Sequence, residues 1–203
     1  MKLIWTLFLS LLWVHATEVD AGIDACKQGD IKRCLEVGII LTTGENAENQ
    51  EKNNLGLELI RKACKYGEEK ACDILGDNYF RNHHYQAAKP YLETSCSRGI
   101  KTACEAMGTI YRDGHDIRQN DLLAREFYEK ACALQSADAC INVAIIYRGG
   151  FGVQHNRAEE KNYYKKACDA GSKAGCDAYT KMDNKDKGIE EPGFLEKLKS
   201  LFN

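Results

Sequence analysis

The 203-residue sequence is poor in proline, has no excess of basic residues and contains no C-x-x-C pair. Only two prolines accompany 17 glycines, which favours helices joined by glycine-containing turns over a β-sandwich. A formal net charge of −2 does not provide the basic surface that nucleic-acid binding needs, so no nucleic-acid partner is expected. Without a C-x-x-C pair, neither a zinc ribbon nor a thioredoxin-like redox centre is predicted.

Long hydrophobic runs are also missing, apart from one short run at the N-terminus. Leu3 to Val14 is apolar or small throughout, but it falls short of the roughly 20 residues that a membrane span needs. The positive Met1-Lys2 start and the small residue Ala16 are typical of a secretory signal peptide. We therefore expect a signal peptide over residues 1–16, cleaved after Ala16, and a secreted or periplasmic protein without a transmembrane span in its mature form. An uncleaved N-terminal anchor is the alternative.

The ten cysteines are the most informative residues, because they form five consecutive pairs with identical spacing. Seven residues separate the two members of every pair. The pairs are Cys26–Cys34, Cys64–Cys72, Cys96–Cys104, Cys132–Cys140 and Cys168–Cys176. From one pair to the next the chain advances by 38, 32, 36 and 36 residues, so the pairs mark an internal repeat of about 36 residues.

Disulfide bonds within each pair are the favoured interpretation, because free thiols are implausible in an exported protein. Residues eight apart in one helix would be roughly 12 Å apart, whereas the Cα atoms of bridged cysteines lie within about 7 Å. The chain must therefore reverse between the two cysteines of a pair. Turn-forming residues occupy this place at Gly29, Gly67, Gly99 and Gly171, with Gln135-Ser136 as the weaker case.

An amphipathic helix is predicted after the second cysteine of each pair. Residues Cys104, Met107, Gly108 and Tyr111 follow the spacing i, i+3, i+4 and i+7 of one helical face. The same pattern recurs at Cys72, Leu75, Gly76 and Tyr79, at Cys140, Val143, Ala144 and Tyr147, and in degenerate form at Cys34, Val37, Gly38 and Leu41. The small residue permits close helix approach, and the aromatic residue fills the gap beyond it.

A second helix is predicted to lead back to the next cysteine pair. The clearest examples are Ala124–Ala131 and Ala158–Ala167, with Asp121 and Asn156 as suitable N-caps. Pro90 does not fit this template, because an interior proline removes a hydrogen bond and clashes with the preceding turn. We expect that helix to start late, at about Ala88, or to be kinked.

These elements predict an all-α fold class: an α-α superhelix, or solenoid, of tetratricopeptide-like helix pairs stapled by disulfides. The repeat domain is expected over residues 17–182, with a leading half-unit (Val19–Lys27), about four repeats and a closing helix from Gly175 to about Met182. Residues 183–203 are expected to form a polar linker and a short amphipathic helix over Phe194–Phe202.

The unit Ala139–Gly171, A-C-I-N-V-A-I-I-Y-R-G-G-F-G-V-Q-H-N-R-A-E-E-K-N-Y-Y-K-K-A-C-D-A-G, resembles a Sel1-like repeat. With the cysteine spacing and the signal peptide, the chain is similar to the Helicobacter cysteine-rich proteins over nearly all of its mature length. The resemblance implies an α-α superhelix, an extracytoplasmic location, and penicillin binding with slow β-lactam hydrolysis.

The sequence itself contains no motif for this hydrolysis. No serine is followed three residues later by lysine, there is no S-D-N, and Lys101-Thr102 is followed by Ala103 rather than glycine. The histidines form no H-x-H-x-D cluster that would hold zinc. No catalytic residue, metal or cofactor is therefore predicted, and an enzymatic function as a β-lactamase rests on the resemblance alone.

A binding function is the alternative that the residues themselves support. The first helix of each pair is expected to line a concave groove. Its groove-facing residues are predicted to be Asp73, Asp77, Glu105, Arg112, Asn142 and Arg148. Arg112 and Arg148 are one repeat apart, so they could form a ladder for a β-lactam or peptidoglycan-derived ligand or for the carboxylate of an extended peptide or protein. Ordinary solvated charge remains the other interpretation of each residue.

Overall fold

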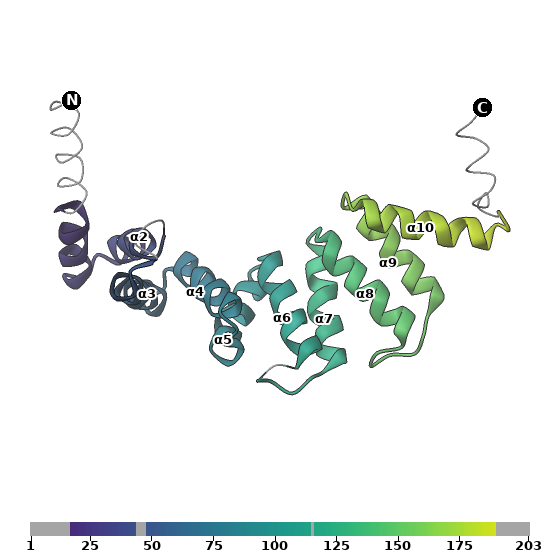
Figure 1. The fold of residues 1–203 in the computed structure, drawn as a ribbon, viewed down its shortest axis with the longest axis horizontal. Coiled ribbons are helices and arrows are strands. Elements are labelled where there is room, and N and C mark those ends of the chain that lie inside the picture. The colour runs from purple at the N-terminus through teal and green to yellow at the C-terminus, as the bar shows by residue number, and fades with distance from the viewer. Residues whose placement is uncertain (1–16, 44–47, 115, 190–203) are drawn as a thin grey trace, which may run out of the picture. The chain divides into compact units, whose positions relative to one another are not determined.

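The computed structural model describes residues 17–43, 48–114 and 116–189, and all regular secondary structure in this part is helical. A helix over residues 17–27 is followed by α2 (Ile31–Thr42), α3 (Gln50–Lys65), α4 (Glu69–Arg81), α5 (Tyr85–Ser97), α6 (Lys101–Asp113), α7 (Asp121–Ala133), α8 (Ala137–Gly149), α9 (Arg157–Asp169) and α10 (Lys173–Asp186) (Figure 1). The all-α prediction is confirmed. The expected signal peptide and the expected helix Phe194–Phe202 lie outside the described residues.

The chain divides between Ser95 and Cys96 into two compact units. In the first unit, α3 packs against both α2 and α4. In the second unit, α6 to α10 pack in chain order, each helix contacting the next (Figure 1). Packing mainly between sequence neighbours is typical of a solenoid.

All five predicted disulfides are present. Each joins the end of one helix to the start of the next, and the bridged Cα atoms are between 4.4 and 4.8 Å apart. Closing a loop of about nine residues is worth roughly 2.5 kcal/mol in the chain-entropy model. The five bonds thus restrict the unfolded chain at regular intervals along its length.

The turns inside four of the five disulfide loops share one hydrogen-bonding pattern. After α3, the Gly67 N–H donates to the Cys64 carbonyl at 3.0 Å, and the Glu68 N–H donates to the Ala63 carbonyl at 3.0 Å. This pair of bonds is the Schellman motif that ends many helices. Both bonds recur in the turns at Gly29, Gln135 and Gly171. The residue that closes the motif is also the N-cap of the following helix, as at Glu68, so one short turn ends one helix and begins the next.

The small and aromatic residues of the repeat pattern pack as predicted. On α6, a Cβ at Gly108 would lie 2.6 Å from the ring of Tyr128, which is 1% exposed. The glycine therefore makes room for the tyrosine of α7. In addition, the Tyr111 ring stacks on Phe127, and one repeat later Tyr147 stacks on Tyr163, each with centroids 5.7 Å apart.

The expectation of a delayed helix start near Pro90 is wrong. Helix α5 begins at Tyr85 and runs through Pro90 to Ser97. Its first turn forms before the proline, because the Ala88 N–H donates to the His84 carbonyl at 2.9 Å. Ala88 and Leu92 are buried on either side of Pro90, with exposures of 0% and 3%, and this packing offsets the missing backbone donor.

Two other boundaries differ from expectation. Asn156 caps α9 as predicted, but the N-cap of α7 is Asn120 rather than Asp121, and its side chain accepts from the Leu123 N–H at 3.0 Å. Helix α10 continues past Met182 to Asp186, because polar side chains of its last turn are bound by α9.

Gln135 gives a test of the turn analysis. It has φ 64°, whereas the matching residues Gly29, Gly67, Gly99 and Gly171 have φ between 86° and 103°. A left-handed conformation costs a non-glycine residue about 1 kcal/mol, and glycine's greater freedom in the unfolded chain offsets part of this gain. Gln135→Gly should therefore raise the free energy of unfolding by about 0.5 kcal/mol in urea titrations. The reverse exchange, Gly171→Gln, should lower the free energy of unfolding. Equal effects of the two variants would contradict the assignment of a left-handed turn position to these residues.

Gly108→Ala tests the packing of the small residue. The added methyl group would overlap the buried Tyr128 ring, and such overpacking costs about 1–3 kcal/mol. Gly149→Ala is the matched control, because its Cβ would also meet an aromatic ring, that of Phe151, but this ring is 50% exposed and can move aside. We expect urea unfolding to show a clear loss for the first variant and a much smaller one for the second.

Candidate functional site

The two predicted ladder arginines each lie beside a tyrosine of the following helix. The guanidinium carbon of Arg112 on α6 is 5.9 Å from the centroid of the Tyr128 ring. One repeat later, Arg148 Nη1 on α8 donates to the Tyr164 hydroxyl at 3.4 Å. Both tyrosines are buried, so they provide fixed walls, while both arginines are exposed. The repeat thus places two cations at matching positions on neighbouring first helices, each beside a tyrosine of the following helix.

Arg112 also meets a third predicted residue. Its Nη1 donates to Asn142 Oδ1 of α8 at 3.4 Å, so the structure brings Arg112 and Asn142 together. Asp113 accepts two further bonds from the same guanidinium, at 2.7 and 3.2 Å. The hydrogen bond that Arg112 donates to Asp113 is the main reason why the pKa of Arg112 is raised above its ordinary value.

Arg148 has a different environment. The residue after it is Gly149, where the repeat before has Asp113, and in the part of the chain that the structure describes Arg148 makes no ion pair. Ile141 and Ile145, which share its face of α8, are partly exposed. This end of the candidate site therefore combines a cation without a carboxylate partner and an apolar strip.

The remaining predicted site residues are placed separately. Glu105 is half-buried on α6, and its charge contributes to raising the pKa of Tyr128, an effect that is mainly due to burial of the tyrosine. In the first unit, Asp73 accepts a hydrogen bond from Ser95, and Asp77 pairs with Arg81 at 3.3 Å. Both aspartates are thus engaged within α4 and α5.

Sequence reasoning missed a carboxylate that links three helices of the second unit. Glu129 Oε1 on α7 accepts from Arg125 at 2.8 Å, from the Tyr163 hydroxyl of α9 at 3.2 Å and from the Tyr147 hydroxyl of α8 at 3.5 Å. Burial, followed by the charge of Glu129, raises the pKa of Tyr163 strongly. The tyrosine therefore stays protonated and donates its hydroxyl hydrogen to Glu129, which suits a structural cluster.

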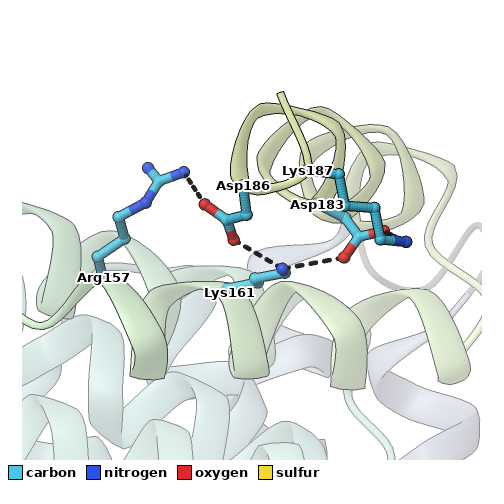
Figure 2. A network of polar contacts seen from close by, with 5 residues as sticks. All are labelled: Arg157, Lys161, Asp183, Asp186 and Lys187. Carbon is cyan, nitrogen blue, oxygen red and sulfur yellow. Dashed lines mark hydrogen bonds and ion pairs between the residues drawn. The ribbon is translucent and has the colours of Figure 1, made fainter. Parts of the chain in front are cut away.

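Sequence reasoning also missed a network of ion pairs between α9 and α10 (Figure 2). Asp186 accepts from Arg157 at 2.8 Å and from Lys161 at 2.7 Å, while Asp183 pairs with Lys161 at 3.0 Å and with Lys187 at 2.6 Å. The spacing of Arg157 and Lys161 on one face of α9 was visible in the sequence, but nothing there revealed the partner helix. Beside this network lies an open pocket of about 590 Å³.

Possible metal ligands and two of the serines can be located in the described residues. No three of their histidine, cysteine, aspartate and glutamate side chains are grouped to hold a metal ion. Ser95 is 1% exposed and donates to Asp73, and Ser136, at 4% exposed, caps α8. No helix within the described ranges has both the length and the apolar character to cross a membrane.

Comparison with known proteins identifies the repeats. The model of the Sel1 repeat family matches residues 102–136 and 137–172, which correspond to the pairs α6–α7 and α8–α9. These two stretches are Sel1 repeats. No curated protein sequence matches it.

Two solved structures share the fold, and a third is similar in sequence. A protective antigen of uropathogenic Escherichia coli strains with an SLR fold has 23% identity and a TM-score of 0.64, over 79% of this chain and 35% of that chain. A Sel1 repeat protein from Oxalobacter formigenes has 20% identity and a TM-score of 0.61, over 81% and 48%. Cysteine-rich protein B of Helicobacter pylori has 25% identity and a TM-score of 0.48, over 60% and 96%. The chain thus spans between about a third and a half of the first two structures.

The α9–α10 network predicts a specific loss of stability in acid. Hydrogen bonds from Lys161 and then Arg157 lower the pKa of Asp186 from 3.8 to about 2, and hydrogen bonds from Lys187 and Lys161 lower that of Asp183. The native state therefore binds fewer protons than the unfolded state in this window, so its stability falls as the pH drops from about 4 to about 2.

Urea unfolding at pH 5 and pH 2.5 measures this effect. Asp183→Asn plus Asp186→Asn should lose less stability between the two pH values than the unsubstituted protein, because two carboxylates with lowered pKa are gone. An unchanged pH dependence in the double variant would contradict the assigned network.

Proposed function

We propose that this disulfide-stapled Sel1-repeat protein is a non-catalytic scaffold that binds an extended peptide segment of a partner protein along α6 and α8. Sel1 repeats typically mediate protein–protein interaction. The observation that carries the proposal is the repeated arginine–tyrosine arrangement at Arg112 and Arg148, with Asn142 between them.

The side chains of this surface fit a peptide in two respects. Arg148 can bind a carboxylate with two parallel hydrogen bonds, and Asn142 can pair with a peptide group. Ile141 and Ile145 can contact an apolar side chain of the same segment. Buried tyrosines on the second helices hold the arginines in place, which reduces the side-chain entropy lost on binding.

The compartment is proposed to be outside the cytoplasm. Five disulfides are typical of proteins in oxidising surroundings. The signal peptide expected over residues 1–16 agrees with secretion or with the periplasm.

Penicillin binding and slow β-lactam hydrolysis remain predictions that rest on the resemblance in sequence. The serines discussed above are buried and act as hydrogen-bonding partners. A chromogenic cephalosporin assay on the purified oxidised protein tests hydrolysis directly. Turnover that co-purifies with the protein through successive columns would replace the scaffold proposal by an enzymatic one.

Arg112→Ala plus Arg148→Ala tests the peptide site. Screening the protein against an array of fluorescent peptides with acidic residues selects a test ligand, and fluorescence anisotropy then gives its Kd. We expect the double variant to weaken binding at least about tenfold, which corresponds to about 1.4 kcal/mol. Arg33→Ala plus Arg118→Ala removes two exposed arginines elsewhere and should leave the Kd unchanged. Equal losses in both double variants would show non-specific attraction and refute the site.

A further inference from the structure

The open pocket beside the α9–α10 network has an unusual charge distribution. Its lining contains three cations, Arg157, Lys161 and Lys165, and one anion, Asp186. The other lining residues are Ala158, Asn162 and Tyr179. Lys161 Nζ lies 5.8 Å from the centroid of the Tyr179 ring. The pocket thus offers three cations, each paired with a carboxylate of the chain, together with an amide group and an aromatic face. Its volume of about 590 Å³ is in the range of small-molecule sites.

The preceding repeat has a close packing contact at the place that corresponds to this pocket. There, α8 ends at Gly149 and the following loop turns back, so that Gly152 packs closely against Asp121 and Leu122 at the start of α7. The residues one repeat later, Arg157 and Ala158, line the pocket. Helix α10 ends at Asp186, one residue past the position that matches Gly149, and Asp186 itself lines the pocket.

Asp186 lies at the pocket and binds two of its cations. It stands one repeat after Gly150, and its carboxylate reaches both Arg157 and Lys161, as Figure 2 shows. The lowered pKa of Asp186 indicates that Lys161 and Arg157 favour an ionised carboxylate at this position. Its side chain is nevertheless 40% exposed, and that of Arg157 is 44% exposed, so an external anion can reach the same donors.

We propose that this pocket binds a small carboxylate-bearing ligand, whose carboxylate replaces that of Asp186 between Arg157 and Lys161. Arg157 can bind the incoming carboxylate with two hydrogen bonds, and Lys161 keeps its contact with Asp183. Asn162 and the Tyr179 ring contact the remainder of the ligand. Displacement of Asp186 frees the last turn of α10. The site does not include Arg112 or Arg148, so this inference is independent of the proposed peptide site.

The recognised group, a carboxylate on a small polar body, occurs both in acidic sugars and in acidic amino acids. Titration of the full mature protein by two-dimensional NMR, at constant ionic strength, distinguishes the two sources with glucuronate and N-acetyl-aspartate amide as test ligands. Inorganic phosphate is the third ligand and tests general anion attraction. We expect one of the carboxylates to produce saturable shifts of the backbone amides in residues 157–162 and 183–187.

Three variants test the competition with Asp186. Asp186→Asn removes the internal carboxylate and should lower the Kd at least about threefold. Lys161→Gln and, separately, the more exposed Arg157→Gln should each raise the Kd at least about fivefold. Asp24→Asn removes a carboxylate from an exposed ion pair with Lys27 in the first unit and should have no effect.

Several results would overturn the proposal. These are the absence of localised shifts with both carboxylates, binding of phosphate at least as tight as that of either carboxylate, and an unchanged Kd in Asp186→Asn. Thermal unfolding of each variant establishes that it is folded under the titration conditions. If one of the two substitutions on α9 prevents folding, the other still decides the result.

Discussion

The structure depends on one constraint, a disulfide between residues eight apart that must bracket a reversal of the chain. In the turn after α3, Cys64 lies two residues before the cap of one helix, and Cys72 lies in the first turn of the next. The Schellman hydrogen bonds and the shared cap residue leave little freedom in the connection. Because the bond fixes where each helix ends and the next begins, it also fixes the register of everything that packs between consecutive turns.

That register determines where the functional chemistry can be. A small residue such as Gly108 admits a buried Tyr128, and the tyrosine in turn forms a wall beside Arg112. One repeat later, the same arrangement surrounds Arg148, but glycine replaces the neighbouring aspartate. Two positions with the same backbone environment thus carry cations that differ in their partners. The repeat places side chains at regular positions, and differences between repeats at single neighbouring residues change the chemistry of each position.

The features that could be predicted from the sequence are those encoded within one repeat: the disulfides, the turns and the small-aromatic packing. The helix through Pro90 could not be predicted, because burial of Ala88 and Leu92 overrides the local effect of proline. In the candidate site, the proximity of Arg112 and Asn142 could be predicted, because both residues had been assigned to the groove-facing side of the first helices. The Glu129 cluster and the α9–α10 network join side chains up to 34 residues apart, and single-sequence periodicity carries no information about such partners.

The closing helix shows how the end of a repeat array can acquire chemistry of its own. The middle of α10 is held by apolar burial, since Met182 packs with Ala144 and Tyr164. Its last turn is held by partly exposed ion pairs, and such pairs contribute little stability singly, about 0–1 kcal/mol. An external ion cannot replace the apolar contacts of Met182, whereas the carboxylate of an external ligand can replace an exposed carboxylate in an ion pair. The division of α10 into these two parts therefore allows its last turn to change partners while the helix itself stays in place.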